Sequence, residues 1–516
     1  MKNPNFKAIL SLSISFLSFF FFLNYSFGNT QKNVLTFPAL FNLTTLNGKN
    51  GFAFNGTSPG SVGFSIKGAG DINGDGIPDM LIFFADGNDI NKVYVVFGRV
   101  EPWPASISLD FIDGTNGFVI IGQSAGFFNI VACAVGDVNG DGIDDILMGD
   151  PGANNQAGQS YILYGSKGPW APEFYLSDLN GKNGFSINGV AENDFSGSFV
   201  SGLGDVNGDG ILDFMIGTGF RGVLNITNQI YVVFGTKAPR PASINLSDLN
   251  GKNGFTINGM DPNDVGSYAI ASLGDINGDG LNDILIGNPS ASNYTGQSYV
   301  IFGKKTPWAS QFNLTSLNGD NGFYINGISP NDYSGYTVSG VGDVNKDGLD
   351  DILIASKWAN QYGQIYIIFG SKNPWHSTIN LKNLNGKNGF TINGVPMNGG
   401  YTIDGAGDIN SDGFDDIFIG ASWVNNETGQ SFIVYGNRNY NPFVNLTNLD
   451  GTNGLVINGI NEGDWCGDSL TPAGDFNKDG IADFSLGASH ANQAAGQAYI
   501  IYGQKKSSKP IKKKVN

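Results

Sequence analysis

The chain has 516 residues, of which 41% are hydrophobic, 14% are charged and 76 are glycine. The hydrophobic fraction excludes a fully disordered chain, and 20 prolines without a three-residue glycine period exclude collagen. The formal net charge of −17 argues against nucleic acid as a partner, because phosphate backbones attract basic surfaces.

The N-terminal residues 1–28 are expected to be a secretory signal peptide. Lys2 and Lys7 form a basic start, the apolar run 8–23 follows, and Ser26 and Gly28 are small residues at positions −3 and −1 of a cleavage site. An uncleaved anchor is the alternative, although the run is short for a membrane span of about 20 residues. No later segment is apolar enough to span a membrane. The mature protein is therefore expected to be extracellular, either secreted or held at the cell surface.

The C-terminal residues 505–516 carry six lysines and no acidic residue. This composition predicts a basic disordered tail, and an electrostatic tether to an acidic surface is the alternative. The chain has two cysteines, Cys133 and Cys466, which fall at different phases of the repeat described below. Two cysteines in an exported chain of this length do not form a disulfide framework, so both are expected to be free.

One ten-residue string, Gly-Asp-x-Asn-x-Asp-Gly-x-x-Asp, occurs seven times at intervals of 65 to 70 residues. Apolar segments keep the same interval. In one repeat, 351–354 and 365–370 follow the acidic string, and 336–342 precedes it. Segments such as 250–259, with the sequence Asn-Gly-Lys-Asn-Gly-Phe-Thr-Ile-Asn-Gly, provide a further strand in each repeat. Each repeat thus predicts four short strands separated by Gly/Asn turns.

Seven four-stranded repeats predict an all-β fold, a seven-bladed β-propeller over residues 34–504. Residues 38–56 resemble a last strand without preceding strands, whereas the final repeat stops after 499–503 and lacks that strand. We therefore expect the N-terminal strand to complete the last blade and close the ring. This arrangement leaves no room for a second domain.

The acidic strings have the composition of calcium-binding loops. Side-chain oxygens occupy positions 1, 3, 5 and 9, counted from the first Asp, and position 7 can offer its backbone carbonyl. Position 6 is always glycine, which a tight loop with φ > 0 requires, and hard oxygen donors at alternate positions suit Ca²⁺. The predicted ligands are, loop by loop, Asp71, Asn73, Asp75, Ile77 and Asp79; Asp137, Asn139, Asp141, Ile143 and Asp145; Asp205, Asn207, Asp209, Ile211 and Asp213; Asp275, Asn277, Asp279, Leu281 and Asp283; Asp343, Asn345, Asp347, Leu349 and Asp351; Asp408, Asn410, Asp412, Phe414 and Asp416; and Asp475, Asn477, Asp479, Ile481 and Asp483.

Two other interpretations of these loops are weaker. An EF-hand needs Glu at position 12 and flanking helices, whereas position 12 is Ile82 in the first loop and Met148 in the second, and the flanks are strands. Ordinary Asp-Gly turns are common, but three close carboxylates repel one another by roughly 1–3 kcal/mol per pair at an effective dielectric constant near 20. Seven repetitions of this repulsion favour up to seven structural Ca²⁺ ions.

The repeats resemble the FG-GAP repeat family, best known from the seven-bladed propeller of integrin α subunits. The acidic loops are the specific part of the resemblance, and the Gly-Ala-Pro half of the family motif survives in forms such as Gly149-Asp150-Pro151 and Gly487-Ala488-Ser489. The Phe-Gly half appears as Val265-Gly266, Ser334-Gly335 or Cys466-Gly467. The resemblance implies calcium binding by the loop between the first and second strands of each blade. It also implies an extracellular adhesion or ligand-binding role.

A candidate ligand surface comes from the loops between the second and third strands. Alignment of these loops places Gly152, Ser290, Trp358, Trp423 and His490 at one position. With Trp465 from a neighbouring loop, the last three rings could form a recognition patch for a glycan or peptide, and packing between blades is the alternative. In contrast, Trp103, Trp170, Trp308 and Trp375 each follow proline after the third strand, so they are expected to be structural.

The sequence offers little for catalysis. It contains only two histidines, His376 and His490, and no glycine-rich phosphate loop. Of the 45 acidic residues, 21 are assigned as ligands in the loops, which leaves fewer for a glycosidase. We therefore expect no enzymatic activity and an extracellular protein or glycan as partner. A self-assembling surface scaffold, or homo-oligomer, is the alternative.

Overall fold

The computed structural model describes residues 37–56, 66–85, 91–100, 102–122, 130–219, 229–259, 269–305, 307–394 and 401–505. The expected signal peptide and all of the basic tail except Lys505 lie outside these residues, as does Val265-Gly266.

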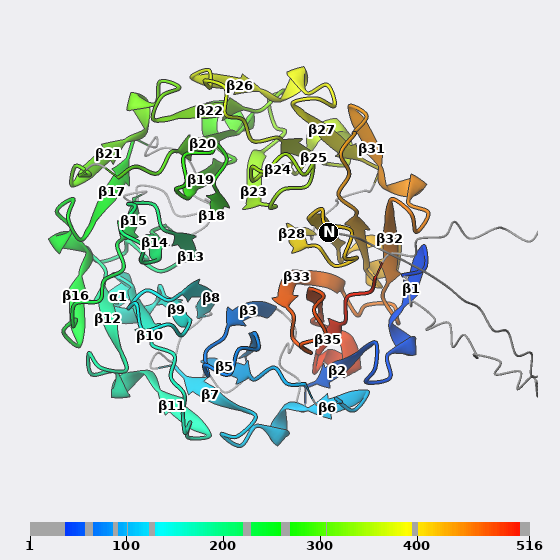
Figure 1. Ribbon diagram of the computed structural model, residues 1–516, viewed down its shortest axis with the longest axis horizontal. Coiled ribbons are helices and arrows are strands. Elements are labelled where there is room, and N and C mark those ends of the chain that lie inside the picture. Colours follow the sequence, from blue (N-terminus) through cyan, green and yellow to red (C-terminus); the bar gives the residue numbers. More distant parts are fainter. Residues whose placement is uncertain are drawn as a thin grey trace, which may run out of the picture. The chain divides into compact units, whose positions relative to one another are not determined.

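The described residues form seven five-stranded sheets arranged around a central axis, a seven-bladed β-propeller (Figure 1). From the axis outward, the first three sheets consist of β3 (Ile66–Gly70), β4 (Asp79–Ala85), β5 (Asn91–Val96), β7 (Gly117–Ile121) and β11 (Glu173–Tyr175); β8 (Val131–Gly136), β9 (Asp145–Asp150), β10 (Gln159–Leu163), β12 (Gly184–Asn188) and β16 (Ser243–Asn245); and β13 (Phe199–Gly204), β14 (Asp213–Gly217), β15 (Ile230–Val233), β17 (Gly254–Asn258) and β21 (Gln311–Asn313). The other four consist of β18 (Ala269–Gly274), β19 (Asp283–Asn288), β20 (Gln297–Ile301), β22 (Gly322–Asn326) and β26 (Thr378–Asn380); β23 (Ser334–Gly340), β24 (Ile352–Ser356), β25 (Gln364–Ile368), β27 (Gly389–Asn393) and β31 (Phe443–Asn445); β28 (Tyr401–Gly407), β29 (Asp416–Ala421), β30 (Gln430–Val434), β32 (Gly454–Asn458) and β1 (Leu40–Asn42); and β33 (Cys466–Gly474), β34 (Asp483–Ala488), β35 (Gln497–Ile501), β2 (Gly51–Asn55) and β6 (Ser106–Ser108).

Each blade has one strand more than the four predicted from the sequence. The inner four strands pair antiparallel, as in β4 with β5 and β5 with β7, and the fifth, outermost strand pairs parallel with the fourth. This fifth strand has three residues and comes from the following repeat; for example, Ser106 of β6 faces Ala53 of β2. A three-residue strand is too short to show a hydrophobic period, so the sequence pattern did not reveal it.

A short 3-10 helix follows each outer strand. The backbone N–H of the residue after the helix donates back to its first carbonyl, as Leu46 does to Leu43. The leucine that opens this helix is buried in every copy, which fixes the outer edge of the blade against the core. These helices are η1 (Leu43–Thr45), η2 (Leu109–Phe111), η3 (Leu176–Asp178), η4 (Leu246–Asp248), η5 (Leu314–Ser316), η7 (Leu381–Asn383) and η8 (Leu446–Asn448).

The N-terminal strands join the last two sheets, whereas the sequence predicted only the completion of the last blade by residues 38–56. β2 pairs antiparallel with β35, with Phe52 opposite Ile500, and β1 pairs parallel with β32. The last sheet also contacts the first, because the backbone N–H of Ile66 donates to Ser469 Oγ at 2.9 Å. The last blade is thus completed by the beginning of the described chain.

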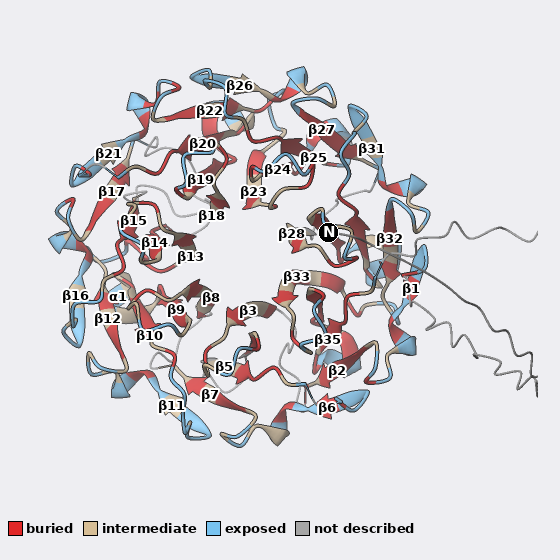
Figure 2. Cartoon of the chain, in the orientation of Figure 1, coloured by how far each residue is buried: buried red, intermediate tan, exposed pale blue. Residues whose placement is uncertain are grey.

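The hydrophobic core lies between neighbouring sheets, where the strands are buried, while the outer strands and turns are exposed (Figure 2). The phenylalanine of each Gly-Phe strand is fully buried, and the expected structural aromatics stack on it: Trp170 lies 4.1 Å from Phe118 between ring centroids, and Trp308 lies 4.2 Å from Phe255. Trp103 stacks on Phe52 and Trp375 on Phe323 in the same way. The structural role predicted for these four tryptophans is confirmed.

Among the described residues, the remaining helical elements are single turns between the second and third strands of five blades. They are α1 (Ala153–Gln156), α2 (Ala291–Tyr294), η6 (Ala359–Gln361), α3 (Val424–Glu427) and α4 (Ala491–Ala494). Within the described ranges, no helix has the length and apolarity needed to cross a membrane. Cys133 and Cys466 are both free thiols, as expected.

Candidate functional site

Each acidic string forms a loop between the first and second strands of a blade, with its side-chain oxygens turned toward its own backbone. In the first loop, the two carboxylate oxygens of Asp71 accept hydrogen bonds from the N–H groups of Asp75 and Gly76, at 3.0 and 2.7 Å. Asn73 Oδ1 accepts from the N–H of Asp75, and Asp75 Oδ1 accepts from the N–H of Ile77. These bonds hold positions 1, 3 and 5 around the inside of one tight turn.

The same turn is built in all seven loops. The carboxylate at position 1 accepts from the N–H of the glycine at position 6 at 2.7–2.8 Å in every copy. That glycine has φ between +80° and +89°, a conformation that disfavours other residues. These glycines are Gly76, Gly142, Gly210, Gly280, Gly348, Gly413 and Gly480.

The aspartate at position 9 has a second role that the sequence did not reveal. Asp79 is fully buried at the start of β4; its Oδ2 accepts from the N–H of Ile72, and its Oδ1 accepts from the N–H of Gly98 after the third strand. The equivalent aspartates of the other six blades also accept from the N–H after the third strand. Their other bond comes from the residue that follows the first Asp in five of these blades, and from the N–H of Asn477 in the last one. These aspartates are Asp145, Asp213, Asp283, Asp351, Asp416 and Asp483. Position 9 therefore ties the loop to the third strand.

Burial raises the pKa of these aspartates. The pKa of Asp79 rises to about 8, mainly through desolvation, and the nearby negative charges of Asp75 and Asp71 add to the shift. The pKa values of Asp145 and Asp213 are raised to about 8 for the same reasons. A buried carboxylate beside two others is costly to ionise, and a divalent cation at the loop would offset that cost.

The loops fit calcium in donor type and in conformation. They present carboxylate and amide oxygens, which calcium prefers, on a turn whose positive-φ glycine permits the oxygens to face inward. Within the part of the chain that the structure describes, no three or more Asp, Glu, His or Cys side chains already form a metal-binding group. Calcium binding by the seven loops therefore stays a prediction, and ligands would have to close on the ion when it binds.

Four pairs of successive loops are joined by the side chain at position 8, a position to which no role was assigned from the sequence. The carboxylate of Asp144 accepts a hydrogen bond from the N–H of Asp71 in the preceding loop, and Asp350 and Asp415 make the same contact one blade apart. Asn282 replaces the aspartate in one blade. Only the arrangement of neighbouring sheets reveals these pairs, because about 70 residues separate the partners.

The candidate aromatic patch divides into a cluster and a separate ring. Trp465 lies between the other two members of the cluster, with ring centroids 5.7 Å from Trp423 and 3.7 Å from His490. Trp358 occupies the position equivalent to Trp423 and His490, immediately before a helical turn, as the alignment predicted. No ring contact connects it to the cluster among the described residues, and Lys357 Nζ lies 5.4 Å from its ring centroid.

Within the cluster, Trp465 is held by its backbone conformation and a hydrogen bond, whereas the ring of Trp423 is exposed. Trp465 adopts φ +59°, which is rare for a bulky residue, and its Nε1–H donates to the Glu427 carboxylate at 3.1 Å. Trp423 nevertheless leaves 46% of its surface exposed and lines a pocket of ≈ 470 Å³ together with Gln430 and Thr447. Packing between blades therefore explains the position of Trp465, but it does not explain the exposed ring of Trp423.

His490 is also held in place by polar contacts. Its Nδ1 lies 3.0 Å from Ser489 Oγ, and that hydroxyl donates to the carboxylate of Asp468. The serine is fully buried between the two groups, so its hydroxyl is not presented to a substrate. This arrangement orients the imidazole toward Trp465 and has no nucleophile at the surface.

Comparison with known proteins agrees with the repeats and the fold. The FG-GAP repeat model matches residues 131–163, 267–301, 334–368 and 399–434. The chain is 29% identical over 176 residues to integrin alpha-5 of Xenopus laevis, covering 33% of this chain and 15% of that protein. It is 28% identical over 245 residues to integrin alpha pat-2 of Caenorhabditis elegans, covering 45% of this chain and 18% of that protein.

A third relative is named as an enzyme. The chain is 27% identical over 354 residues to the phosphatidylinositol-glycan-specific phospholipase D of Dictyostelium discoideum, covering 62% of this chain and 34% of that protein. The matched region is thus about a third of that relative, and under a fifth of the two integrins. Together with the seven sheets, these similarities establish the chain as a seven-bladed β-propeller containing FG-GAP repeats and similar to integrin α subunits.

Proposed function

We propose that this chain is an exported adhesion or ligand-binding propeller, which holds structural Ca²⁺ in its seven acidic loops. In this proposal, the cluster of Trp423, Trp465 and His490 contacts an extracellular protein or glycan. The similarity to integrin α subunits supports the class of function, and the aromatic cluster supports the location of the binding surface.

The exposed ring of Trp423 is the observation that carries the proposal. The side chain of Trp423 remains 46% exposed beside the ring of Trp465, whereas Trp103 and Trp308 are buried in the core. Flat aromatic faces suit the apolar faces of sugars and the side chains of peptides. Glu427 beside Trp465, and Asn426 and Glu462, which hydrogen-bond to each other, add polar groups that could fix a ligand's orientation.

In this proposal, calcium stabilises the aromatic surface without contacting the ligand. The loops join the first and second strands, whereas the aromatic cluster comes from loops between the second and third strands and between successive blades. An ion bound in the loops would fix the packing of the sheets that carry the aromatic rings, without touching the ligand. Binding is therefore expected to weaken in chelator as the sheets loosen.

The test compares ligand capture by the exported chain and by single variants. The purified protein is applied to a glycan array and to immobilised cell-surface extracts, with calcium and with chelator. We expect Trp423→Ala to lose capture at least tenfold with an unchanged melting temperature. Phe443→Ala, which removes a ring that is 67% exposed on an outer strand, is the matched control and should bind normally. Equal binding by wild type and Trp423→Ala would contradict the proposed surface.

Two alternatives have their own readouts. The expectation that the chain is not an enzyme stays a prediction, because one relative is named as a phospholipase D; release of products from a phosphatidylinositol-glycan substrate by the purified protein would overturn it. A self-assembling scaffold would form sheets or filaments in purified material, which electron microscopy detects directly.

A further inference from the structure

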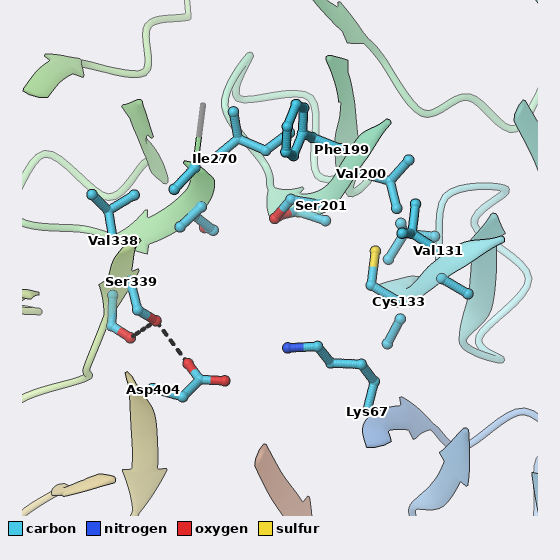
Figure 3. Close-up of a pocket in the computed structure, with 18 of the residues that line it drawn as sticks. Lys67, Val131, Cys133, Phe199, Val200, Ser201, Ile270, Val338, Ser339 and Asp404 are labelled. Atoms are coloured by element: carbon cyan, nitrogen blue, oxygen red, sulfur yellow. Dashed lines mark hydrogen bonds between the residues drawn. The ribbon is translucent and has the colours of Figure 1, made fainter. Parts of the chain in front are cut away.

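The axis of the propeller contains a cavity of ≈ 1030 Å³ (Figure 3). Its walls are the innermost strands of six blades, β3, β8, β13, β18, β23 and β28, and Pro472 of β33 contributes from the seventh. A cavity of this size matches the sites that bind small molecules. It is separate from the aromatic cluster and meets the acidic loops at Gly136, Gly204 and Leu212. The inference drawn from it does not depend on the function proposed for the loops or the cluster.

One equivalent position in each innermost strand, four residues before the first Asp of the loop, forms a ring of different side chains. The ring consists of Lys67, Cys133, Ser201, Ala271, Ser339, Asp404 and Thr471. Alanine, serine and threonine at four of these positions show that the blade itself needs no charge here. The ammonium group of Lys67 and the carboxylate of Asp404 therefore call for another explanation than folding.

The carboxylate is held in position by its own blade and the preceding one. Asp404 Oδ1 accepts hydrogen bonds from Ser339 Oγ at 2.7 Å and from the N–H of Gly405 at 3.0 Å. Figure 3 shows Asp404 and Lys67 pointing into the same space from different blades, with Cys133 beside the lysine. Lys67 is close enough to favour the ionised form of Asp404, yet among the described residues the two groups form no ion pair within 4.0 Å.

An apolar wall adjoins the two charges. Val131, Phe199, Ile270 and Val338 line the cavity and are labelled around its other side in Figure 3. A positive group and a negative group that face one cavity without pairing, next to apolar side chains, are complementary to a molecule with both charges and an apolar part. A purely apolar ligand would leave both charges without a partner, which is costly.

We propose that the axial cavity binds a small zwitterion with an apolar side chain, of the class of free amino acids and dipeptides. The ligand's carboxylate accepts from Lys67 Nζ, its ammonium group donates to Asp404, and its side chain packs against Phe199 and Ile270. Each charge of the ligand thus replaces the water that otherwise solvates its partner in the cavity.

Titration calorimetry with two zwitterions of different charge separation, leucine and leucylleucine, tests the proposal. The halves of leucine, 4-methylpentanoate and 3-methylbutylamine, are titrated in parallel. We expect one of the zwitterions to bind with 1:1 stoichiometry and each half to bind at least tenfold more weakly, since each lacks one charge-assisted hydrogen bond.

Substitutions of the two charged residues test whether the zwitterion binds in the cavity. Lys67→Met and Asp404→Asn should each weaken binding of the zwitterion at least tenfold, and Asp404→Asn keeps an acceptor for Ser339 and Gly405. Lys252→Met and Asp178→Asn change exposed residues on the outer rim and should bind like wild type. Absence of binding by both zwitterions at millimolar concentration, or equal binding by the cavity variants and the rim controls, would overturn the proposal. Melting temperatures of all variants confirm that each one is folded.

Discussion

Asp71 and Asp144 exchange two hydrogen bonds between neighbouring blades. The N–H of Asp71 donates to Asp144 Oδ2 at 2.8 Å, and the N–H of Asp144 donates to the carbonyl oxygen of Asp71 at 3.2 Å. Asp275 and Asp350 repeat the pair, with a side-chain bond of 2.7 Å. The first residue of an acidic loop is thus fixed by the blade that follows it, so the loops act as links around the propeller.

Removal of the Asp144 carboxylate is expected to weaken this link. Asp144→Ala leaves the N–H of Asp71 without its acceptor in a half-buried site, which should lower the free energy of unfolding by about 1–3 kcal/mol. Asp144→Asn keeps an acceptor oxygen and should cost much less, because Asn282 makes the same contact with Asp205 in this chain. Urea denaturation of the two variants measures the difference, and equal stability would show that the link contributes nothing.

Chelation of calcium is expected to lower the melting temperature by far more than 3 °C. Extracellular calcium modules bind at about 10⁻⁴ M, so millimolar calcium would add about 1.4 kcal/mol per occupied loop, or near 10 kcal/mol for seven independent loops. Differential scanning calorimetry in calcium and in EDTA measures the shift, and magnesium at the same concentration is the control. A shift below about 3 °C would refute a structural role for the ion.

The repeat made much of the fold predictable. The spacing of the acidic strings gave the number of blades, and the missing last strand of the final repeat indicated the partner of β2. The outer strands, such as Ser106–Ser108, could not be predicted because three residues show no period and their partners lie in the preceding blade. The dual hydrogen bonding of Asp79 was missed for a related reason: Gly98 is near it only once the third strand has paired.

The candidate surface was predictable only in part. Sequence alignment of the loops placed Trp358, Trp423 and His490 at equivalent positions, and the structure agrees. Among the described residues, however, no ring contact joins these three positions directly to one another. Trp465, from a different loop, is the residue that brings Trp423 and His490 together, and its φ of +59° could not be inferred from the sequence.

Two tryptophan substitutions should have opposite consequences. Trp308 is buried and stacked on Phe255 at 4.2 Å, so Trp308→Ala is expected to lower the free energy of unfolding by about 3–5 kcal/mol. Trp423 leaves 46% of its surface exposed, so Trp423→Ala should change stability by about 0.5 kcal/mol or less while ligand capture is lost. Thermal melts and binding assays on the same preparations measure both effects. A large loss of stability in Trp423→Ala would mean that its ring serves packing between blades.

The stability of the folded chain is expected to depend on pH through Asp404, which lines the axial cavity. Burial raises the pKa of its carboxyl above the ordinary value of 3.8, although Lys67 and the hydrogen bond from Ser339 act in the opposite direction. The folded chain therefore holds this proton more tightly than the unfolded chain, so the contribution of Asp404 to stability is greatest at acidic pH and falls as pH rises above 3.8.

Asp404→Asn removes this titration and keeps an acceptor oxygen for Ser339 and Gly405. Its melting temperature should therefore rise relative to wild type between pH 4 and pH 7. The other carboxylates titrate in both proteins, so the difference between the two melting curves isolates the effect of Asp404. Lys67→Met should enlarge the pH dependence of the chain that retains Asp404, because the lysine favours the ionised carboxylate. A difference between wild type and Asp404→Asn that stays constant from pH 4 to pH 7 would show that the folded state does not shift this pKa.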